Sequence, residues 1–338
     1  MINGRVADLS LFKSALVVKP SSLGDIVHAL PAARFIKKAH PDLQLRWVCN
    51  PEWIPVLEGN ADIAEVIPFP RSEFRGAAGP FKFLFWARRL NAAPRELPEI
   101  TLDLQGLLRS GLISLARGSD PVIGMSDARE GSSLLHRATV PVDRDAHAVD
   151  RCLTMVRALG VPTTPKDMEF TLPEGTPPAG GKLPEKFVVL HPYSRGRGKS
   201  LSDECIQNFC DCLAPRPVVI VGRGQHGMSF TGGHVTSLLN QTSLGELIWL
   251  LRHAHGCVSV DSGPMHMAAA VNPHTLGIHT WSDPRKVGPY PSTASVWKAG
   301  RIGARETFTD AEAANHQKVE SAAIRRIADF VIREWFKD

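Results

Sequence analysis

The residues Lys19-Pro20-Ser21-Ser22-Leu23-Gly24-Asp25-Ile26-Val27-His28-Ala29-Leu30-Pro31 stand where a buried strand passes into a helix. The apolar run 15–18 precedes them, and apolar residues continue at helical spacing after them. The stretch therefore predicts a strand, a tight loop and a helix, the repeating unit of α/β proteins. A loop at the carboxyl end of a parallel strand lies at the crevice of an open sheet, where α/β proteins bind ligands.

Gly24 and Asp25 occupy the turn into this helix. Glycine lets the backbone turn where a side chain would clash, and Asp25 is predicted to open the helix on the side of the crevice. Two interpretations of Asp25 stay open. It is either a capping residue that accepts hydrogen bonds from the first turn, or a reactive carboxylate of the site.

Strands and helical segments alternate along the chain, which predicts parallel sheets. The 338 residues exceed one ordinary domain and suggest two domains of roughly 150 residues each. A proline-rich stretch separates them and is expected to be the linker. The predicted order is an N-terminal domain, a linker, a C-terminal domain and a last helix that either closes the second core or crosses back to the first domain: residues 1–165, 166–186, 187–315 and 316–338.

Composition argues against several classes of protein. The net charge of +5 is mild and does not by itself argue for a nucleic-acid partner, since a DNA-binding domain clusters Lys and Arg along one helix or face. No nucleic-acid partner is expected. The six cysteines form no Cys-x-x-Cys pair, which argues against a zinc site and a disulfide framework. No apolar run approaches the ~20 residues that span a bilayer, and no secretion signal is recognised. We expect a cytoplasmic protein.

Residues 71–95 hold six basic side chains against one acid, with aromatic residues interleaved. One interpretation is a solvated helix face whose aromatic rings contact the core. The other is an acceptor site, because guanidinium groups bind carboxylates and phosphates, while aromatic rings favour a lipid surface.

Two loops of the second half are candidates for an anion site. Residues 191–199 combine two glycines with three cations and predict either a phosphate cradle or a mobile basic turn. Residues 261–266 (Asp-Ser-Gly-Pro-Met-His) predict a bare helix N-terminus, whose partial positive charge suits a diphosphate. His266 falls on its first turn, where it either donates to the same anion or is an ordinary helix histidine. Neither a Walker loop nor a dinucleotide fingerprint is present.

Three motifs together resemble glycosyltransferase family 9, the ADP-heptose heptosyltransferases of the bacterial lipopolysaccharide inner core. Residues 22–31 look like that family's acceptor-side motif, residues 103–110 (Asp-Leu-Gln-Gly-Leu-Leu-Arg-Ser) like its second motif, and residues 261–266 like its donor motif. The three occur in the family's order and span nearly the whole chain.

The resemblance implies a GT-B type α/β fold, with two Rossmann-like domains whose parallel sheets face a central cleft. It implies inverting, metal-independent transfer of a heptose from ADP-heptose to an acidic sugar of the lipid-linked core, with no cofactor besides the nucleotide sugar. It also implies a cytoplasmic enzyme in peripheral contact with the inner face of the cytoplasmic membrane.

Roles of individual residues follow from the same resemblance. Asp25 would be the general base, and Lys199 would stabilise the departing diphosphate. Donor contacts are assigned, besides Lys199, to Ser194, Asp261, Ser262, Gly263 and His266. Acceptor contacts are assigned to Gly24, Gln105 and Arg109.

The chain also departs from the family pattern. The family has an aromatic residue and a proline after its lysine, where this chain has Ser200 and Leu201. It carries an acidic residue in a later loop, where this chain offers Gln225 and His226. Three alternatives therefore remain: another nucleotide sugar, a protein hydroxyl as acceptor, or a nucleotide-sugar-binding protein without catalysis. A nicotinamide-dependent dehydrogenase is disfavoured by the missing fingerprint.

Overall fold

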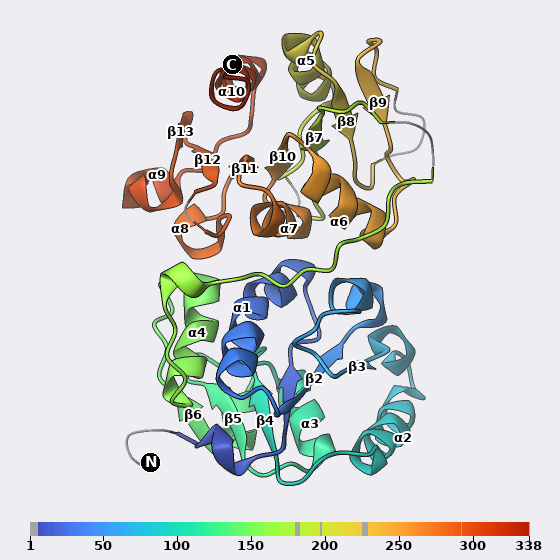
Figure 1. Ribbon diagram of the computed structural model, residues 1–338, viewed down its shortest axis with the longest axis vertical. Helices are drawn as coiled ribbons and strands as arrows, with labels where there is room; N and C mark the ends of the chain where they lie inside the picture. Colours follow the sequence, from blue (N-terminus) through green and yellow to red (C-terminus); the bar gives the residue numbers. More distant parts are fainter. Residues whose placement is uncertain (1–5, 180–182, 197, 225–228, 292, 338) are drawn as a thin grey trace. The chain divides into compact units, whose positions relative to one another are not determined.

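The computed structural model describes residues 6–179, 183–196, 198–224, 229–291 and 293–337. The chain divides into two compact units, Met1–Pro173 and Glu174–Asp338. Each unit is an open sheet with helices packed on it (Figure 1). The boundary between the two units, at Pro173, lies inside the stretch expected to be the linker.

The first unit is built on a six-stranded parallel sheet in the order β3-β2-β1-β4-β5-β6. Every residue of β1 and β4 is buried, as expected for central strands covered on both faces. The order reverses between β1 and β4, so the loops that follow these two strands meet at a topological switch point. The elements are β1 (Ser14–Val18), β2 (Gln44–Cys49), β3 (Glu65–Pro68), β4 (Glu99–Asp103), β5 (Val122–Met125), β6 (Ala138–Val140), α1 (Leu23–Ala39), α2 (Gly79–Ala92), α3 (Leu108–Arg117) and α4 (Ala148–Ala158).

The second unit repeats this order in a seven-stranded sheet, β13-β12-β11-β10-β7-β8-β9, in which only the β12–β13 pair is antiparallel. Its switch point lies between β7 and β10. The elements are β7 (Val188–His191), β8 (Val218–Ile220), β9 (Val235–Ser237), β10 (Gly256–Val260), β11 (Thr275–Ile278), β12 (Ser295–Lys298), β13 (Arg301–Gly303), α5 (Asp203–Leu213), α6 (Leu244–His253), α7 (Gly263–Val271), α8 (Pro284–Val287), α9 (Asp310–Ala314) and α10 (Ser321–Trp335).

The stretch predicted as a linker is shared between the two units. Glu169 forms ion pairs with Arg34 and Lys38 of α1, at 2.7 and 2.6 Å. Further along, the amide of Thr176 donates to the carbonyl of Gly245 at the start of α6. The proline-rich segment is therefore anchored to α1 before residue 173 and to α6 after it.

The C-terminal helix α10 belongs to the second unit. It packs against α5, and its apolar face is buried in that unit's core. A side chain at Gly256 would meet the ring of Trp335 at 2.4 Å, so the start of β10 must be glycine for the helix to pack there. This packing shows that α10 closes the core of the second unit, which is one of the two roles expected for this helix.

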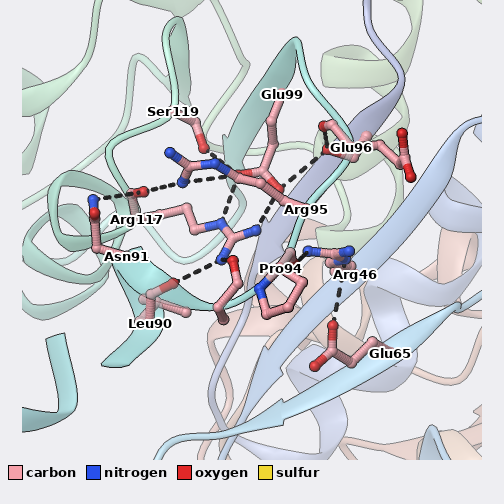
Figure 2. A network of polar contacts seen from close by, with 12 residues as sticks. Arg46, Glu65, Leu90, Asn91, Pro94, Arg95, Glu96, Glu99, Arg117 and Ser119 are labelled. Atoms are coloured by element: carbon pink, nitrogen blue, oxygen red, sulfur yellow. Dashed lines mark hydrogen bonds and ion pairs between the residues drawn. The ribbon is translucent and has the colours of Figure 1, made fainter. Parts of the chain in front are cut away.

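A buried ion-pair network holds α2 and α3 against the start of β4 (Figure 2). Arg117 pairs with Glu99 through Nε at 2.6 Å and Nη2 at 2.9 Å, and both side chains are fully buried. Nη1 of Arg117 also donates to the carbonyl of Leu90 at the end of α2. Burial raises the pKa of Glu99, but its bonds with Arg117 and Ser119 outweigh burial and lower it. The network therefore fixes the C-terminal end of α2 in the first unit.

Candidate functional site

The loops after β1 and β4 are joined at the switch point of the first unit. The ammonium of Lys19, at the end of β1, donates to the carbonyl of Leu104 at 2.6 Å. The indole of Trp47 donates in turn to the Lys19 carbonyl at 3.2 Å. These bonds hold together the two loops that carry the first and second predicted motifs.

Asp25 is the third residue of α1 and caps that helix. Its Oδ2 accepts hydrogen bonds from the amide of Ser22 at 2.8 Å and from the Ser22 hydroxyl at 2.7 Å. The capping interpretation is therefore confirmed, and Gly24 lies buried beside it in the same turn. Capping does not remove Asp25 from the site, because the same side chain lines a polar pocket.

That pocket of about 110 Å³ lies at the switch point of the first unit. Asp25 is its acid, and cationic side chains surround the space. Gln105 also lines it, and its buried Oε1 has no hydrogen-bond partner among the described residues. The lining comprises Lys19, Asp25, His28, Leu104, Gln105, Met125, Arg129, Ala148, Arg151 and Cys152. A carboxylate beside cations and an unsatisfied amide oxygen suits a polar, acidic ligand.

The sequence analysis missed Lys19, Arg129 and Arg151 as candidates for this pocket. Lys19 stood within the opening motif and could have been found from its place at the end of β1. The amide of Arg129 donates to the Gly106 carbonyl at 2.8 Å, which places Arg129 beside the second motif. Arg151 lies on α4 and forms an ion pair with Asp127. No local pattern marks these two arginines, because tertiary contacts alone place them.

Asp103 shapes the second motif. Its buried carboxylate accepts from the amides of Gln105 and Gly106 at 3.0 and 2.9 Å and from the Ser110 hydroxyl at 3.0 Å. Gly106 has φ +67°, and a side chain there would meet the backbone of Ala128 at 3.2 Å. The motif therefore forms a tight turn that presents Gln105 to the pocket.

Arg109 occupies a different place from Gln105. It lies in the first turn of α3, outside the set of residues that line the pocket in the described chain. Burial lowers the pKa of Arg109, and the positive charge of Arg71 lowers it further. Arg109 is thus influenced by the charges of Arg71 and Glu130, and of the three residues expected to contact an acceptor only Gln105 is among the described residues that line this pocket.

Asp261 is the centre of the candidate site in the second unit. Its Oδ2 accepts from the Lys199 ammonium and from the Ser282 hydroxyl, each at 2.5 Å. The hydroxyl of Ser194 donates to the Asp261 carbonyl at 3.2 Å. Three predicted donor-site residues, Ser194, Lys199 and Asp261, thus meet in direct contact, and Ser282 joins them.

The charge of Asp261 is fixed by its surroundings. Burial raises its pKa, but the neighbouring His279 ring, the Lys199 ammonium and the Ser282 hydroxyl outweigh burial and hold the pKa at about 2. Burial lowers the pKa of His279 to about 4, so this ring is neutral at pH 7. At neutral pH Asp261 is therefore an ionised carboxylate beside a neutral His279 ring.

Trp281 also contacts the ammonium group of Lys199. The Lys199 Nζ lies 4.6 Å from the centre of the indole, within the range of a cation–π interaction. The ring remains 45% exposed. Since Trp281 directly precedes Ser282, one turn supplies two contacts to the same pair.

The remaining donor-site residues lie at the start of α7. Ser262 is the N-cap residue but makes no side-chain cap; its hydroxyl bonds instead to the carbonyl of Val260 at 3.0 Å and to the His191 ring at 3.3 Å. Gly263 begins the helix, and His266 is buried in its first turn, close enough to His279 to lower that pKa. The predicted helix N-terminus is therefore present, beside the Lys199–Asp261 pair.

Ser200, which stands where the family has an aromatic residue, closes the loop that begins at His191. The Ser194 amide donates to the Ser200 hydroxyl at 3.0 Å, and the Leu201 amide donates to the Pro192 carbonyl at 2.9 Å. Serine at position 200 therefore closes this turn through its hydroxyl. Arg197, Gln225 and His226 lie outside the described residues.

Within the described ranges, no three His, Cys, Asp or Glu side chains are grouped as ligands for a metal ion. Two Rossmann-like units with the same strand order, each with polar residues at its switch point, have the architecture of GT-B type glycosyltransferases. The chain belongs to glycosyltransferase family 9 (heptosyltransferase), whose family model matches residues 94–200 and 214–317.

Comparison with individual proteins agrees with this assignment. The chain is 27% identical over 287 residues to lipopolysaccharide heptosyltransferase 1 of Pseudomonas aeruginosa, covering 81% of each chain. It is 26% identical over 307 residues to lipopolysaccharide heptosyltransferase 1 of Escherichia coli K12, covering 85% of this chain and 93% of the relative. The solved structure of E. coli heptosyltransferase WaaC with ADP matches with a TM-score of 0.72 at 21% identity, over 94% of this chain and 99% of that one.

Proposed function

We propose that this glycosyltransferase moves a heptose from ADP-heptose to an acidic sugar of the lipopolysaccharide inner core, with inversion at the anomeric carbon and without a metal ion. The names of the relatives support the sugar and the pathway. The observation that carries the proposal is the Lys199–Asp261 pair at the uncapped N-terminus of α7.

The second unit would hold the donor. Helix amides at Gly263 and the Lys199 ammonium supply positive charge for a diphosphate, which a helix N-terminus favours. As the bond between the anomeric carbon and the phosphate oxygen breaks, negative charge grows on that oxygen, and Lys199 is the cation at hand to stabilise it. Ser194 and His266 would add hydrogen bonds to the same group. A protein cation then does the work that other transferases assign to a divalent metal.

The first unit would hold the acceptor. Asp25 would take the proton of the acceptor hydroxyl as its oxygen attacks the anomeric carbon, a step worth ~10²–10⁴ in rate. Lys19 and Arg129 line the same pocket and suit the carboxylate of an acidic sugar. Gln105 would accept a hydrogen bond from a sugar hydroxyl, which would satisfy its buried Oε1.

A lipid-linked acceptor requires the enzyme to reach a membrane surface. None of the helices in the described part of the chain is long and apolar enough to cross a membrane. Because the proposed acceptor is lipid-linked, we propose a cytoplasmic enzyme in peripheral contact with the inner face of the cytoplasmic membrane.

Calorimetric titration with ADP and with UDP, in buffer without divalent metal, tests the donor side. Tighter binding of ADP supports the proposal. Preference for UDP, or binding only after Mg²⁺ is added, would contradict the donor or the metal-free mechanism.

The variant Lys199→Met should weaken ADP binding by about 10- to 100-fold, the value of a charge-assisted hydrogen bond. Lys186→Met, an exposed lysine of the same unit, is the matched control and should bind ADP normally. Equal affinities of the two variants would remove Lys199 from the diphosphate site.

A further inference from the structure

The outward face of α2 presents aromatic side chains to solvent. Phe81 is 77% exposed, Phe85 64% and Leu84 49%. Phe81 and Phe85 are four residues apart, so they lie one turn apart on the same side of the helix. Large exposed rings at helical spacing are not explained by folding of the unit, because a soluble helix normally turns polar residues outward.

The inward face of α2 already supplies the core contacts. Trp86 packs edge-on against Phe69 with ring centres 5.0 Å apart, and its indole donates to the Pro68 carbonyl at 3.0 Å. Phe83 meets Phe74 at 5.7 Å, and Leu90 is buried in the same core. Of the two interpretations of residues 71–95, the core contact is thus real, but it uses a different set of aromatic residues from those exposed.

Cations flank the exposed rings. Lys82, Arg88 and Arg89 are all exposed, and α2 contains no acidic residue. The guanidinium of Arg89 lies 6.0 Å from the centre of the Phe85 ring. Rings in the middle of a face with cations at its sides are the pattern of a helix that lies in a membrane interface, where long basic side chains reach the headgroups.

The neighbouring helix shows the same outward apolar character. α2 packs against α3, which lies beside it in the first unit (Figure 1). On α3, the side chains of Leu108, Leu112 and Leu115 are 43%, 41% and 49% exposed. They recur at helical spacing, so α3 also turns an apolar stripe to solvent.

We propose that the outward face of α2 docks on a bilayer rich in anionic phospholipid, with Phe81 and Phe85 entering the interface and Lys82, Arg88 and Arg89 pairing with lipid phosphates. Charge complementarity selects this occupant: a second copy of the chain would bring the same cations against one another. The inference rests on the proposed function in one respect, since a lipid-linked acceptor gives the enzyme a reason to dock.

The docking geometry is supported by the rigidity of the helix. Arg117 holds the Leu90 carbonyl, and Asn91 donates to the Arg117 carbonyl at 3.1 Å. The aromatic face is therefore presented by a helix fixed at its C-terminal end to the buried ion-pair network (Figure 2).

Cosedimentation of the full chain with vesicles tests the proposal. Vesicles of phosphatidylglycerol and phosphatidylethanolamine should bind the protein, and vesicles of phosphatidylcholine alone should bind it at least ~10-fold more weakly, because the anionic surface potential contributes part of the affinity for each cation. Raising the salt concentration should weaken binding to the anionic vesicles.

Two variants separate the contributions. Phe81→Ser with Phe85→Ser should reduce vesicle affinity by at least ~10-fold through loss of apolar burial. Lys82→Gln with Arg88→Gln and Arg89→Gln should reduce it by about 100-fold through loss of three cations. The matched controls alter exposed side chains elsewhere in the same unit: Leu11→Ser, and the triple change Arg137→Gln, Arg144→Gln and Lys166→Gln.

ADP titration of the same proteins keeps the two proposals apart. All variants should bind ADP like the parent protein, because the changes lie in the first unit. Their far-UV circular dichroism and thermal unfolding should match those of the parent, which shows that the first unit is folded. The docking surface would be overturned if the parent protein did not bind vesicles, or if the variants and their controls bound them equally. ADP binding by the same proteins would then leave the proposed function standing. A parent protein that binds vesicles through α2 but does not bind ADP would overturn the proposed function alone.

Discussion

The ammonium nitrogen of Lys199 lies 2.5 Å from Oδ2 of Asp261. The same nitrogen lies 4.6 Å from the centre of the Trp281 ring, so a carboxylate and an aromatic face hold it together. The position of the cation is therefore set by Asp261 and Trp281.

Substitution of Trp281 should weaken binding of the diphosphate without unfolding the protein. Trp281→Leu removes the cation–π interaction, worth about 0.5–1 kcal/mol at an exposed site, so the Kd for ADP should rise about twofold to fivefold. Trp281→Phe keeps an aromatic face and should recover most of the affinity. Calorimetry with ADP measures both, and equal losses in the two variants would show that the ring acts only through its bulk.

The two roles of Asp25 can be measured separately. Asn accepts the same hydrogen bonds at a helix start, so Asp25→Asn should change stability little while turnover falls by at least ~10². Asp25→Ala loses both roles and should also lose about 1 kcal/mol of stability. Urea denaturation and single-turnover rates give the two values. Near-normal turnover in the Asn variant would exclude Asp25 as the general base.

Stability should fall between pH 6.5 and pH 4 because of two buried histidines. Burial lowers the pKa of His191 to about 4, and that of His279 to about 4, from the ordinary value of 6.5. In this range the unfolded chain binds protons that the folded chain excludes, so protonation favours unfolding. Each ring then contributes on the order of 3 kcal/mol that is present at pH 7 and lost as the pH falls to 4.

Urea denaturation at pH 7, 5.5 and 4.5 follows this loss. The variant His191→Asn keeps an acceptor for the serine hydroxyls but does not titrate, so its stability should depend less on pH. His253→Gln, an exposed histidine, is the control and should follow the parent protein. Identical pH dependence in all three proteins would assign the loss to other groups.

Breaking the buried pair of Glu99 and Arg117 should destabilise the first unit strongly. Glu99→Gln leaves the Arg117 guanidinium buried without a carboxylate, at a cost of about 3–5 kcal/mol. Replacing both, as in Glu99→Leu with Arg117→Met, should recover much of this loss because no buried charge remains. Thermal unfolding of the three proteins tests this expectation, and a double variant that is no more stable than Glu99→Gln would contradict it.

The sequence predicted those parts of the fold that are written in local pattern. β1 and β10 are apolar runs, and each is followed directly by its motif in the sequence. Strand and loop could therefore be predicted from one short stretch of residues. Asp103 and Gln105 are two residues apart, so the turn that joins them was also within reach. Short strands such as β6 and β13, with three residues each, leave too weak a pattern to be recognised.

Contacts between distant segments could not be predicted. Arg129 reaches the pocket because its backbone bonds to Gly106, 23 positions earlier in the numbering. Ser282 reaches Asp261 because β10 and β11 are neighbours in the sheet. The amphipathic pattern of α10 shows that one face of the helix is buried, but it does not show which of the two cores that face packs on. The hydrophobic pattern of a helix or strand predicts which of its faces is buried. The element that this face packs against is determined only when the sheet is assembled.

The separate cores have an evolutionary consequence. Helix α10 completes the second core, and α1 with the segment up to Pro173 completes the first, so neither core borrows a buried helix from the other half. A single recombination event near Pro173 would therefore exchange the whole second unit between relatives and leave the other hydrophobic core intact. If the two units bind donor and acceptor as proposed, such shuffling makes new pairs of sugar donor and acceptor without any repacking of buried side chains.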